Sequence, residues 1–182
     1  MTDKAPPLFV VTGGPGAGKT TLIDALARAG FVVAPEAGRR IIRERQASGG
    51  RALPWIDPLL FAEAMLDLDA AAYRSHTAVR APVFFDRGIP DIVGYLRLEG
   101  LPVPPHVVRA AQTLRYQRRA FICPPWPQIY GTDSERRQTP EIAEKTYRMM
   151  VATYGDYGYE LVEVPRVSTN ERVRFLLEAI EA

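Results

Sequence analysis

One segment, LFVVTGGPGAGKTTLIDALARAG at residues 8–30, constrains the fold more than any other part of the chain. Residues 8–12 are mostly apolar and predict a buried strand, and residues 19–29 have the apolar spacing of an amphipathic helix. The turn between them is rich in glycine, which lets backbone N–H groups point inward where a Cβ atom would collide. The following helix directs the positive end of its dipole to the same place. The segment therefore predicts a phosphate-binding loop between a strand and a helix.

The turn matches the pattern G-x-x-x-x-G-K-[ST], which is the P-loop. In this motif the lysine reaches the β- and γ-phosphates, and the hydroxyl that follows it is a ligand of Mg²⁺, which assigns these roles to Lys19 and Thr20. Only three of the 23 basic residues are lysines, so the position of Lys19 in the motif carries weight. The predicted nucleotide-binding residues are Gly13, Gly14, Pro15, Gly16, Ala17, Gly18, Lys19, Thr20 and Thr21.

Strand-like and helix-like segments alternate along the rest of the chain. The predicted strands are residues 8–12, 31–35, 82–86, 119–123 and 159–164. The predicted helices are residues 19–29, 37–48, 57–78, 90–98, 104–117 and 139–153, with a last one that begins at 168. Apolar strands separated by helices are typical of a mainly parallel sheet that is covered on both faces. We therefore expect an α/β, three-layer P-loop NTPase fold with a five-stranded sheet, formed by residues 1–182 as a single domain.

The third predicted strand ends in an aspartate, as in a Walker B segment. In sheets of this kind ligands bind beyond the carboxyl ends of the strands. If the third strand lies beside the first, Asp86 comes next to the P-loop, where it can hold Mg²⁺ together with Thr20. The alternative is an aspartate that only caps a turn.

Four segments between residues 13 and 147 resemble known families: GGPGAGKTT, PEAGRR, FFDRGIPD and YGTDSERRQTPEIAEKTY. The sequences Asp86-Arg87-Gly88 and Pro35-Glu36 resemble motifs of deoxynucleoside and thymidylate kinases. The whole chain more closely resembles a family of small P-loop kinase-like proteins, often labelled AAA-type ATPases, that are related to the nicotinamide riboside kinase domain. This resemblance implies MgATP as the phosphoryl donor, with ATP rather than GTP inferred from the family alone.

The resemblance also implies roles for individual side chains. Glu36 would accept the proton of an acceptor hydroxyl, and Arg87 would contact the acceptor or the transferring phosphoryl group. A lid over residues 124–141 would bring Arg136 or Arg137 over the phosphates. Each role has a simpler alternative: an exposed loop carboxylate for Glu36, an ion pair with Asp86 or Glu36 for Arg87, and a solvated basic loop for the lid.

Asp91 is set aside at this stage. It lies in the first turn of the helix that Pro90 opens, where the helix dipole favours a carboxylate in any case.

Composition narrows the class of protein further. The net charge of +2 is close to neutral, so a nucleic-acid partner is not expected. The apolar runs are too short to cross a bilayer and the first residues lack the order of a signal peptide, so no membrane partner is expected either. A single cysteine, Cys123, excludes an internal disulfide and fits a cytoplasmic location. The oligomeric state stays open.

The function that these features favour is a kinase that transfers the γ-phosphoryl group of MgATP to a small molecule, such as a nucleoside or nucleotide. One alternative is a nucleotide switch or NTPase that acts through a partner, and another is a kinase for RNA or DNA ends. A pocket for an acceptor distinguishes the first from the second, and residues 37–80 are long enough to build one.

Overall fold

The computed structural model describes residues 6–129 and 139–181. Within these ranges five strands form one sheet in the order β2-β3-β1-β4-β5, and every neighbouring pair is parallel. The strands are β1 (Leu8–Gly13), β2 (Val32–Ala34), β3 (Val83–Asp86), β4 (Arg119–Cys123) and β5 (Glu160–Glu163). The expected parallel α/β sheet is confirmed, with β1 between β3 and β4.

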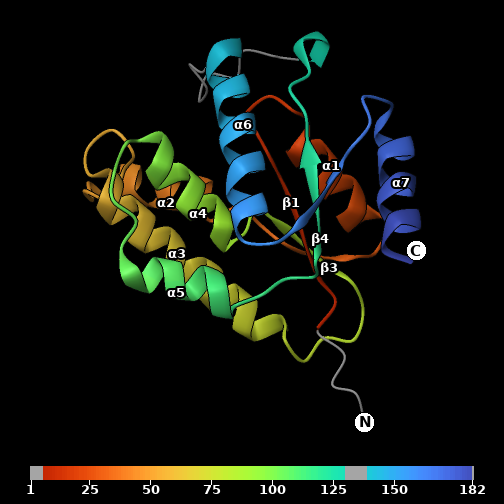
Figure 1. The fold of residues 1–182 in the computed structure, drawn as a ribbon, viewed down its shortest axis with the longest axis horizontal. Coiled ribbons are helices and arrows are strands. Elements are labelled where there is room, and N and C mark those ends of the chain that lie inside the picture. Colours follow the sequence, from red (N-terminus) through yellow and green to blue (C-terminus); the bar gives the residue numbers. More distant parts are fainter. Residues whose placement is uncertain (1–5, 130–138, 182) are drawn as a thin grey trace.

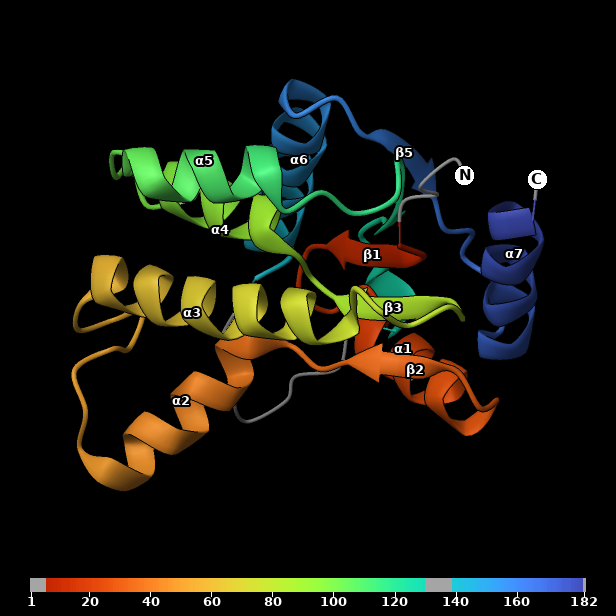
Figure 2. The same ribbon diagram turned by 90° about the horizontal axis from the view of Figure 1, so that it is seen from below.

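Helices cover both faces of this sheet (Figures 1 and 2). They are α1 (Lys19–Arg28), α2 (Ala37–Ser48), α3 (Pro58–His76), α4 (Ile89–Leu98), α5 (Pro105–Thr113), α6 (Pro140–Asp156) and α7 (Thr169–Glu181), with a short 3₁₀ turn, η1 (Pro127–Ile129). In Figure 1, α1 and α7 lie together on one side of the sheet, and α3, α4 and α5 lie on the other. None of the helices in the described ranges is long and apolar enough to cross a membrane.

The sheet has one apolar core on each face, and side chains that alternate along β1 contribute to both. Leu8 and Val10 pack in a cluster with α3, α4, α5 and α6, whereas Phe9 and Val11 pack in a second cluster with α1 and α7. All four side chains are buried. Because successive residues of a strand point to opposite faces, the apolar run LFVV supplies both layers at once. The central strand that carries the P-loop is therefore held from both sides.

α2 stands apart from this sandwich and packs on α3. Figure 2 shows α2 beside α3 and away from the strands. A third apolar cluster joins the two helices through Ile41, Ala52 and Phe61. The start of α3 is fixed by Asp57, whose Oδ1 accepts a hydrogen bond from Leu60 N at 3.0 Å. The segment between β2 and β3 thus forms a wall beyond the carboxyl ends of the strands.

Two helix ends differ from the expectation. The helix predicted to reach residue 117 ends at Thr113, because Leu114 leaves helical geometry and Gln117 N donates a hydrogen bond to Leu8 O at 2.8 Å instead. The helix predicted to end at 153 continues to Asp156. There Asp156 accepts a hydrogen bond from Arg97 Nη1 at 2.7 Å, which ties α6 to α4. Tertiary contacts, which a local pattern does not contain, decide both ends.

Candidate active site

The glycine-rich turn between β1 and α1 has a shape that only glycine adopts easily. Gly13, Gly16 and Gly18 have φ values of 127°, 70° and 74°, in the range that side-chain-bearing residues rarely adopt. A Cβ atom on Gly13 would lie 2.3 Å from the carbonyl oxygen of Cys123, and one on Gly14 would lie 2.5 Å from a carbonyl oxygen of α6. The turn is therefore fitted closely between β4 and α6.

Lys19, the first residue of α1, lies inside this turn. Its Nζ donates hydrogen bonds to Gly13 O at 3.0 Å and to Gly14 O at 2.6 Å. Burial lowers the pKa of Lys19 to about 8, and the nearby Arg87 guanidinium adds to the effect. A phosphate group in the turn would favour the charged ammonium again. The next residue, Thr20, is exposed at the start of the same helix.

β3 does lie beside β1, and Asp86 pairs in register with Val11. Asp86 therefore lies at the edge of the P-loop, with 6% of its surface exposed. Among the described residues its Oδ1 atom has no hydrogen-bond partner. Burial, together with the negative charge of Glu36, raises the pKa of Asp86 to about 6. A buried carboxylate oxygen without a partner fits a site that a cation or its bound water completes.

Asp86 and Thr20 together offer two oxygen ligands, which suits Mg²⁺ bound jointly with phosphate better than a metal ion that needs several protein ligands. In the part of the chain that the structure describes, no group of three or more His, Cys, Asp or Glu side chains could hold a metal. Mg²⁺ is commonly bound through one or two protein oxygens, with phosphate and water as its other ligands. The two predicted metal-binding residues fit that arrangement.

Replacing Asp86 with Asn should stabilise the ligand-free protein. At pH 7.5 we expect a gain of about 1–3 kcal/mol in the free energy of unfolding, because the variant no longer buries a carboxylate charge whose Oδ1 lacks a hydrogen-bond partner among the described residues. The pKa of Asp86 is raised in the folded state, so the ionised carboxylate destabilises the fold above that pKa and ceases to do so as the pH falls. The gain should therefore shrink between pH 7.5 and pH 5.

Urea unfolding at the two pH values measures this effect. Asp67→Asn, on the exposed side of α3, is the matched control and should change little at either pH. A loss of stability in Asp86→Asn at pH 7.5 would contradict the account of Asp86 as an unpartnered buried charge.

Arg87, the residue after Asp86, bridges two other carboxylates. Its Nε donates to Glu36 Oε1 at 3.2 Å and its Nη1 donates to Asp91 Oδ1 at 3.0 Å. The ion pair that was the simpler alternative for Arg87 is thus present, with Asp91 rather than Asp86 as its second partner. Arg87 has a φ of 72°, and it is the one residue other than glycine with a positive φ among those described. Strain of this kind persists where surrounding contacts fix the residue, as the two carboxylates do here.

Glu36 lies at the carboxyl end of β2, immediately before α2. Arg39 Nε lies 3.0 Å from Glu36 Oε2, so both carboxylate oxygens face a guanidinium. Burial opposes the ionisation of Glu36, but the charges of Arg87, Lys19 and Arg39 outweigh it and lower the pKa. Glu36 is therefore ionised at neutral pH, as a proton acceptor must be, and the exposed loop carboxylate considered as an alternative is not what the structure contains.

The buried Asp91 side chain, which the sequence analysis set aside, is central to this network. Its Oδ1 accepts hydrogen bonds from Thr12 Oγ1 at 2.6 Å and from Arg87. Its Oδ2 accepts from Gly88 N at 2.9 Å and from Tyr154 Oη at 2.6 Å. The carboxylate thus joins β1, α4 and α6 and fixes the Arg87 side chain. Its only signal in the sequence is its place in the first helical turn after Asp86-Arg87-Gly88.

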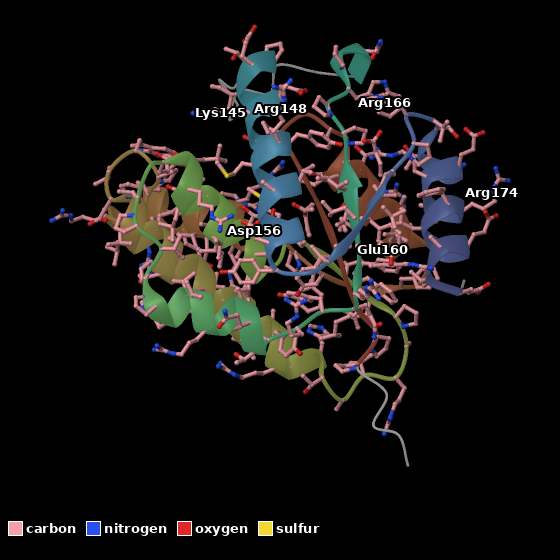
Figure 3. The ribbon with its side chains drawn as sticks, viewed as in Figure 1. Lys145, Arg148, Asp156, Glu160, Arg166 and Arg174 are labelled. Carbon is pink, nitrogen blue, oxygen red and sulfur yellow. The ribbon has the colours of Figure 1, made fainter. Side chains whose placement is uncertain are left out.

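A pocket of about 430 Å³ opens beside this network. Its polar lining comes from Glu36, Arg39, Asp69, Arg87, Asp91, Glu99, Thr146 and Lys145. Its apolar lining includes Ala37, Ile42, Phe61, Met65, Ile92, Tyr95, Leu98, Ile142 and Met150. The volume lies within the ordinary range for small-molecule sites. Helices α2 and α3 supply much of its wall, so residues 37–80 do form a pocket, and its lining residue Lys145 lies near the N-terminal end of α6, next to Arg148 in Figure 3.

The opposite side of the P-loop is supported by Arg172 of α7, which the sequence analysis did not identify. Its buried guanidinium donates to Ala17 O and Gly18 O, each at 3.2 Å, and to Cys123 Sγ at 3.0 Å. It also lies 5.6 Å from the ring centre of Trp126. Cys123 is buried as expected. Arg172 therefore links the last helix to the P-loop backbone across 154 positions of sequence.

The expected lid, residues 124–141, is described only at its two ends. Trp126 and η1 follow β4, and Thr139 begins α6 by accepting a hydrogen bond from Ile142 N at 3.4 Å. Arg136 and Arg137 lie outside the described residues, so their placement stays a prediction.

The parallel sheet and the P-loop between β1 and α1 define a P-loop protein with a kinase-like fold. The chain belongs to the family whose model is AAA_28, described as an AAA domain, which matches residues 8–172. This confirms the family resemblance drawn from the sequence. A comparison with curated proteins gives no significant match.

Several solved structures share the fold at low identity. Deoxyadenosine kinase from M. mycoides is 11% identical, with a TM-score of 0.66 over 96% of this chain and 98% of that one. Thymidylate kinase from Ehrlichia chaffeensis is 14% identical, with a TM-score of 0.61 over 98% of this chain and 100% of that one. The NadR protein in complex with NR is 18% identical, with a TM-score of 0.65 over 96% of this chain and 50% of that one. At these identities the likeness establishes the fold.

Proposed function

We propose that the protein is a kinase that transfers the γ-phosphoryl group of MgATP to a hydroxyl group of a small molecule. The observation that carries this proposal is the pocket of about 430 Å³ that has Pro15 of the P-loop, Glu36 and Arg87 in its wall. A phosphate held by the loop and an acceptor held by the pocket would meet at Glu36. The structural neighbours named as kinases of deoxyadenosine and thymidylate, and the one in complex with NR, support a nucleoside-like or nucleotide-like acceptor.

Each side chain has a definite task in this reaction. The P-loop amides and Lys19 hold the phosphates, and Arg172 holds the loop. Thr20 and Asp86 would hold Mg²⁺, which supplies positive charge to the phosphate oxygens when bound. We propose that Arg136 or Arg137 closes over the same phosphates and excludes water.

The chemical step needs one base. The acceptor oxygen forms a bond to the γ-phosphorus while the bond from that phosphorus to the bridging oxygen breaks, and ADP leaves. The hydroxyl proton passes to a carboxylate oxygen of Glu36, which is ionised and lies partly buried beside Arg87. Arg87 is placed to stabilise the negative charge that is shared between the acceptor and the transferring group.

A nucleotide switch that acts through a partner protein is the second candidate. A nucleotide switch requires the P-loop but no separate pocket for a small-molecule acceptor, so the pocket beside Glu36 favours the kinase. We also propose that residues 1–182 form a single domain and that the protein is cytoplasmic, a setting with which the free, buried Cys123 is consistent.

A phosphorylation screen tests the proposal. The protein is incubated with MgATP and pooled nucleosides, nucleotides and other metabolites, and mass spectrometry follows compounds that gain one phosphate. We expect at least one such compound with the wild-type protein and none above background with Lys19→Ala, because that variant lacks the charge that holds the phosphates. ATP hydrolysis without any modified acceptor would favour the nucleotide switch instead.

A further inference from the structure

Asp69 is a buried carboxyl group that the proposed reaction does not use. It lies on α3, one and two helical turns after Met65 and Phe61, so the three side chains share one face of the helix. That face lines the pocket, and only 7% of the Asp69 surface is exposed. Among the residues that the structure describes, none forms a hydrogen bond or an ion pair with Asp69.

The other buried or partly buried carboxylates near the P-loop are accounted for. Glu36 faces two arginines, and Asp91 accepts four hydrogen bonds. Asp86 lies at the end of β3 and is not part of the pocket lining. Asp69 alone among these faces the acceptor pocket without a protein donor.

The surroundings of Asp69 make an empty pocket unfavourable for its charge. Burial, followed by repulsion from Asp91 and Glu36, raises its pKa well above the ordinary value for an aspartate. A buried polar group without a partner costs free energy, and a carboxylate costs more than a neutral group. A ligand that brings a hydrogen-bond donor to Asp69 removes this cost.

We propose that Asp69 is an acceptor-binding residue that selects a small molecule carrying a hydroxyl or amino donor and no phosphate group. The inference rests on the proposed kinase function and narrows its acceptor. The expected acceptor is then a nucleoside-like compound and not a nucleotide-like one, whereas the motifs and the structural neighbours are compatible with both.

The charges around the pocket support an acceptor without phosphate. Within the described lining, Glu36, Asp69, Asp91 and Glu99 are acidic, and Arg39, Arg87 and Lys145 are basic. Both arginines already face carboxylates, at 3.0–3.2 Å. Lys145 is exposed, so it is a solvated charge rather than a buried anion site. A phosphate dianion would therefore enter a chamber in which both arginines already face carboxylates and the acidic Asp69 has no protein partner among the described residues.

The rest of the pocket suits a ring. Phe61 and Tyr95 meet edge to face with their ring centres 5.5 Å apart, and Met65, Ile92 and Met150 complete an apolar surface around them. Tyr95 Oη is buried without a hydrogen-bond partner among the described residues. An acceptor with a flat apolar part and a hydroxylated part matches a chamber that is lined by both apolar and polar side chains.

Equilibrium binding without ATP tests the inference. The probes are the common ribonucleosides and 2′-deoxyribonucleosides, each paired with its 5′-monophosphate, and calorimetry gives the dissociation constants. We expect a nucleoside to bind more tightly than its monophosphate, and Asp69→Ala to bind that nucleoside about 10- to 100-fold more weakly than the wild-type protein. The matched control is Asp67→Ala, two residues away on the exposed side of α3, which should bind like the wild-type protein.

Stability measurements separate recognition from a structural role. Because Asp69 has no protein donor, Asp69→Ala should unfold at the same temperature as the ligand-free wild-type protein or higher, whereas a structural side chain would lower that temperature. Three results would overturn the inference: wild-type affinity in Asp69→Ala, tighter binding of the monophosphates, or no binding of any nucleoside. A nucleoside that binds through Asp69 but gains no phosphate in the Lys19-controlled screen would support the inference and refute the kinase function alone. A nucleotide phosphorylated equally well by Asp69→Ala would do the reverse.

Discussion

Glu36→Gln is expected to lower the rate of phosphoryl transfer by about 10²- to 10⁴-fold while MgATP binding is retained. Glutamine has the same length as glutamate and keeps an oxygen that can accept a hydrogen bond from Arg87 or Arg39. It cannot accept the proton of the acceptor hydroxyl. The loss should therefore fall on the turnover number and not on the dissociation constant for the nucleotide.

Initial rates with the acceptor from the screen, together with calorimetric titration of MgATP, measure the two effects separately. Glu44→Gln is the matched control, because Glu44 is an exposed glutamate of α2 that pairs only with Arg40, at 2.8 Å, among the described residues. It should have wild-type kinetics. Full activity in Glu36→Gln would remove Glu36 as the base and leave its contacts with Arg87 and Arg39 as its role.

The parts of the site that the sequence could predict rest on local signals. The P-loop needs particular φ values over consecutive residues, so the glycines that permit them identify it without tertiary information. Helix starts are equally local. Asp57-Pro58 and Thr139-Pro140 open α3 and α6 as expected, and Glu171 caps α7 by accepting hydrogen bonds from Ser168. The apolar run that ends in Asp86 predicts a strand locally, and placing Asp86 beside the P-loop required one further assumption, that β3 pairs with β1.

Two functional candidates, Asp69 and Asp91, had no such signal. Asp67 and Asp69 stand two residues apart in MLDLDAAAY, and only the packing of α3 makes the first exposed and the second buried in the pocket. Asp91 acquires its importance from Thr12 and Tyr154, which lie 79 and 63 positions away. Such contacts depend on how helices settle on the sheet, so a pattern of local periodicity cannot contain them.

Asp91→Asn is expected to cost about 3–5 kcal/mol in the free energy of unfolding, because it breaks a buried, hydrogen-bonded ion pair. The carboxylate accepts hydrogen bonds from Thr12, Arg87, Gly88 and Tyr154, so every oxygen lone pair that it offers has a donor. An amide in its place directs an N–H₂ group toward one pair of those donors. It also leaves the Arg87 guanidinium with Glu36 as its remaining carboxylate partner among the described residues.

Urea unfolding of three variants distinguishes this network from ordinary surface charge. Tyr154→Phe removes one donor and should cost about 1 kcal/mol. Asp156→Asn removes an exposed partner of Arg97 on the same helix as Tyr154 and should cost about 0.5 kcal/mol or less. If Asp91→Asn proves no more costly than Asp156→Asn, Asp91 does not hold β1, α4 and α6 together. In the expected order of costs, the carboxylate that fixes the Arg87 side chain is also one that the fold needs, because Asp91 joins Arg87 to the central strand β1.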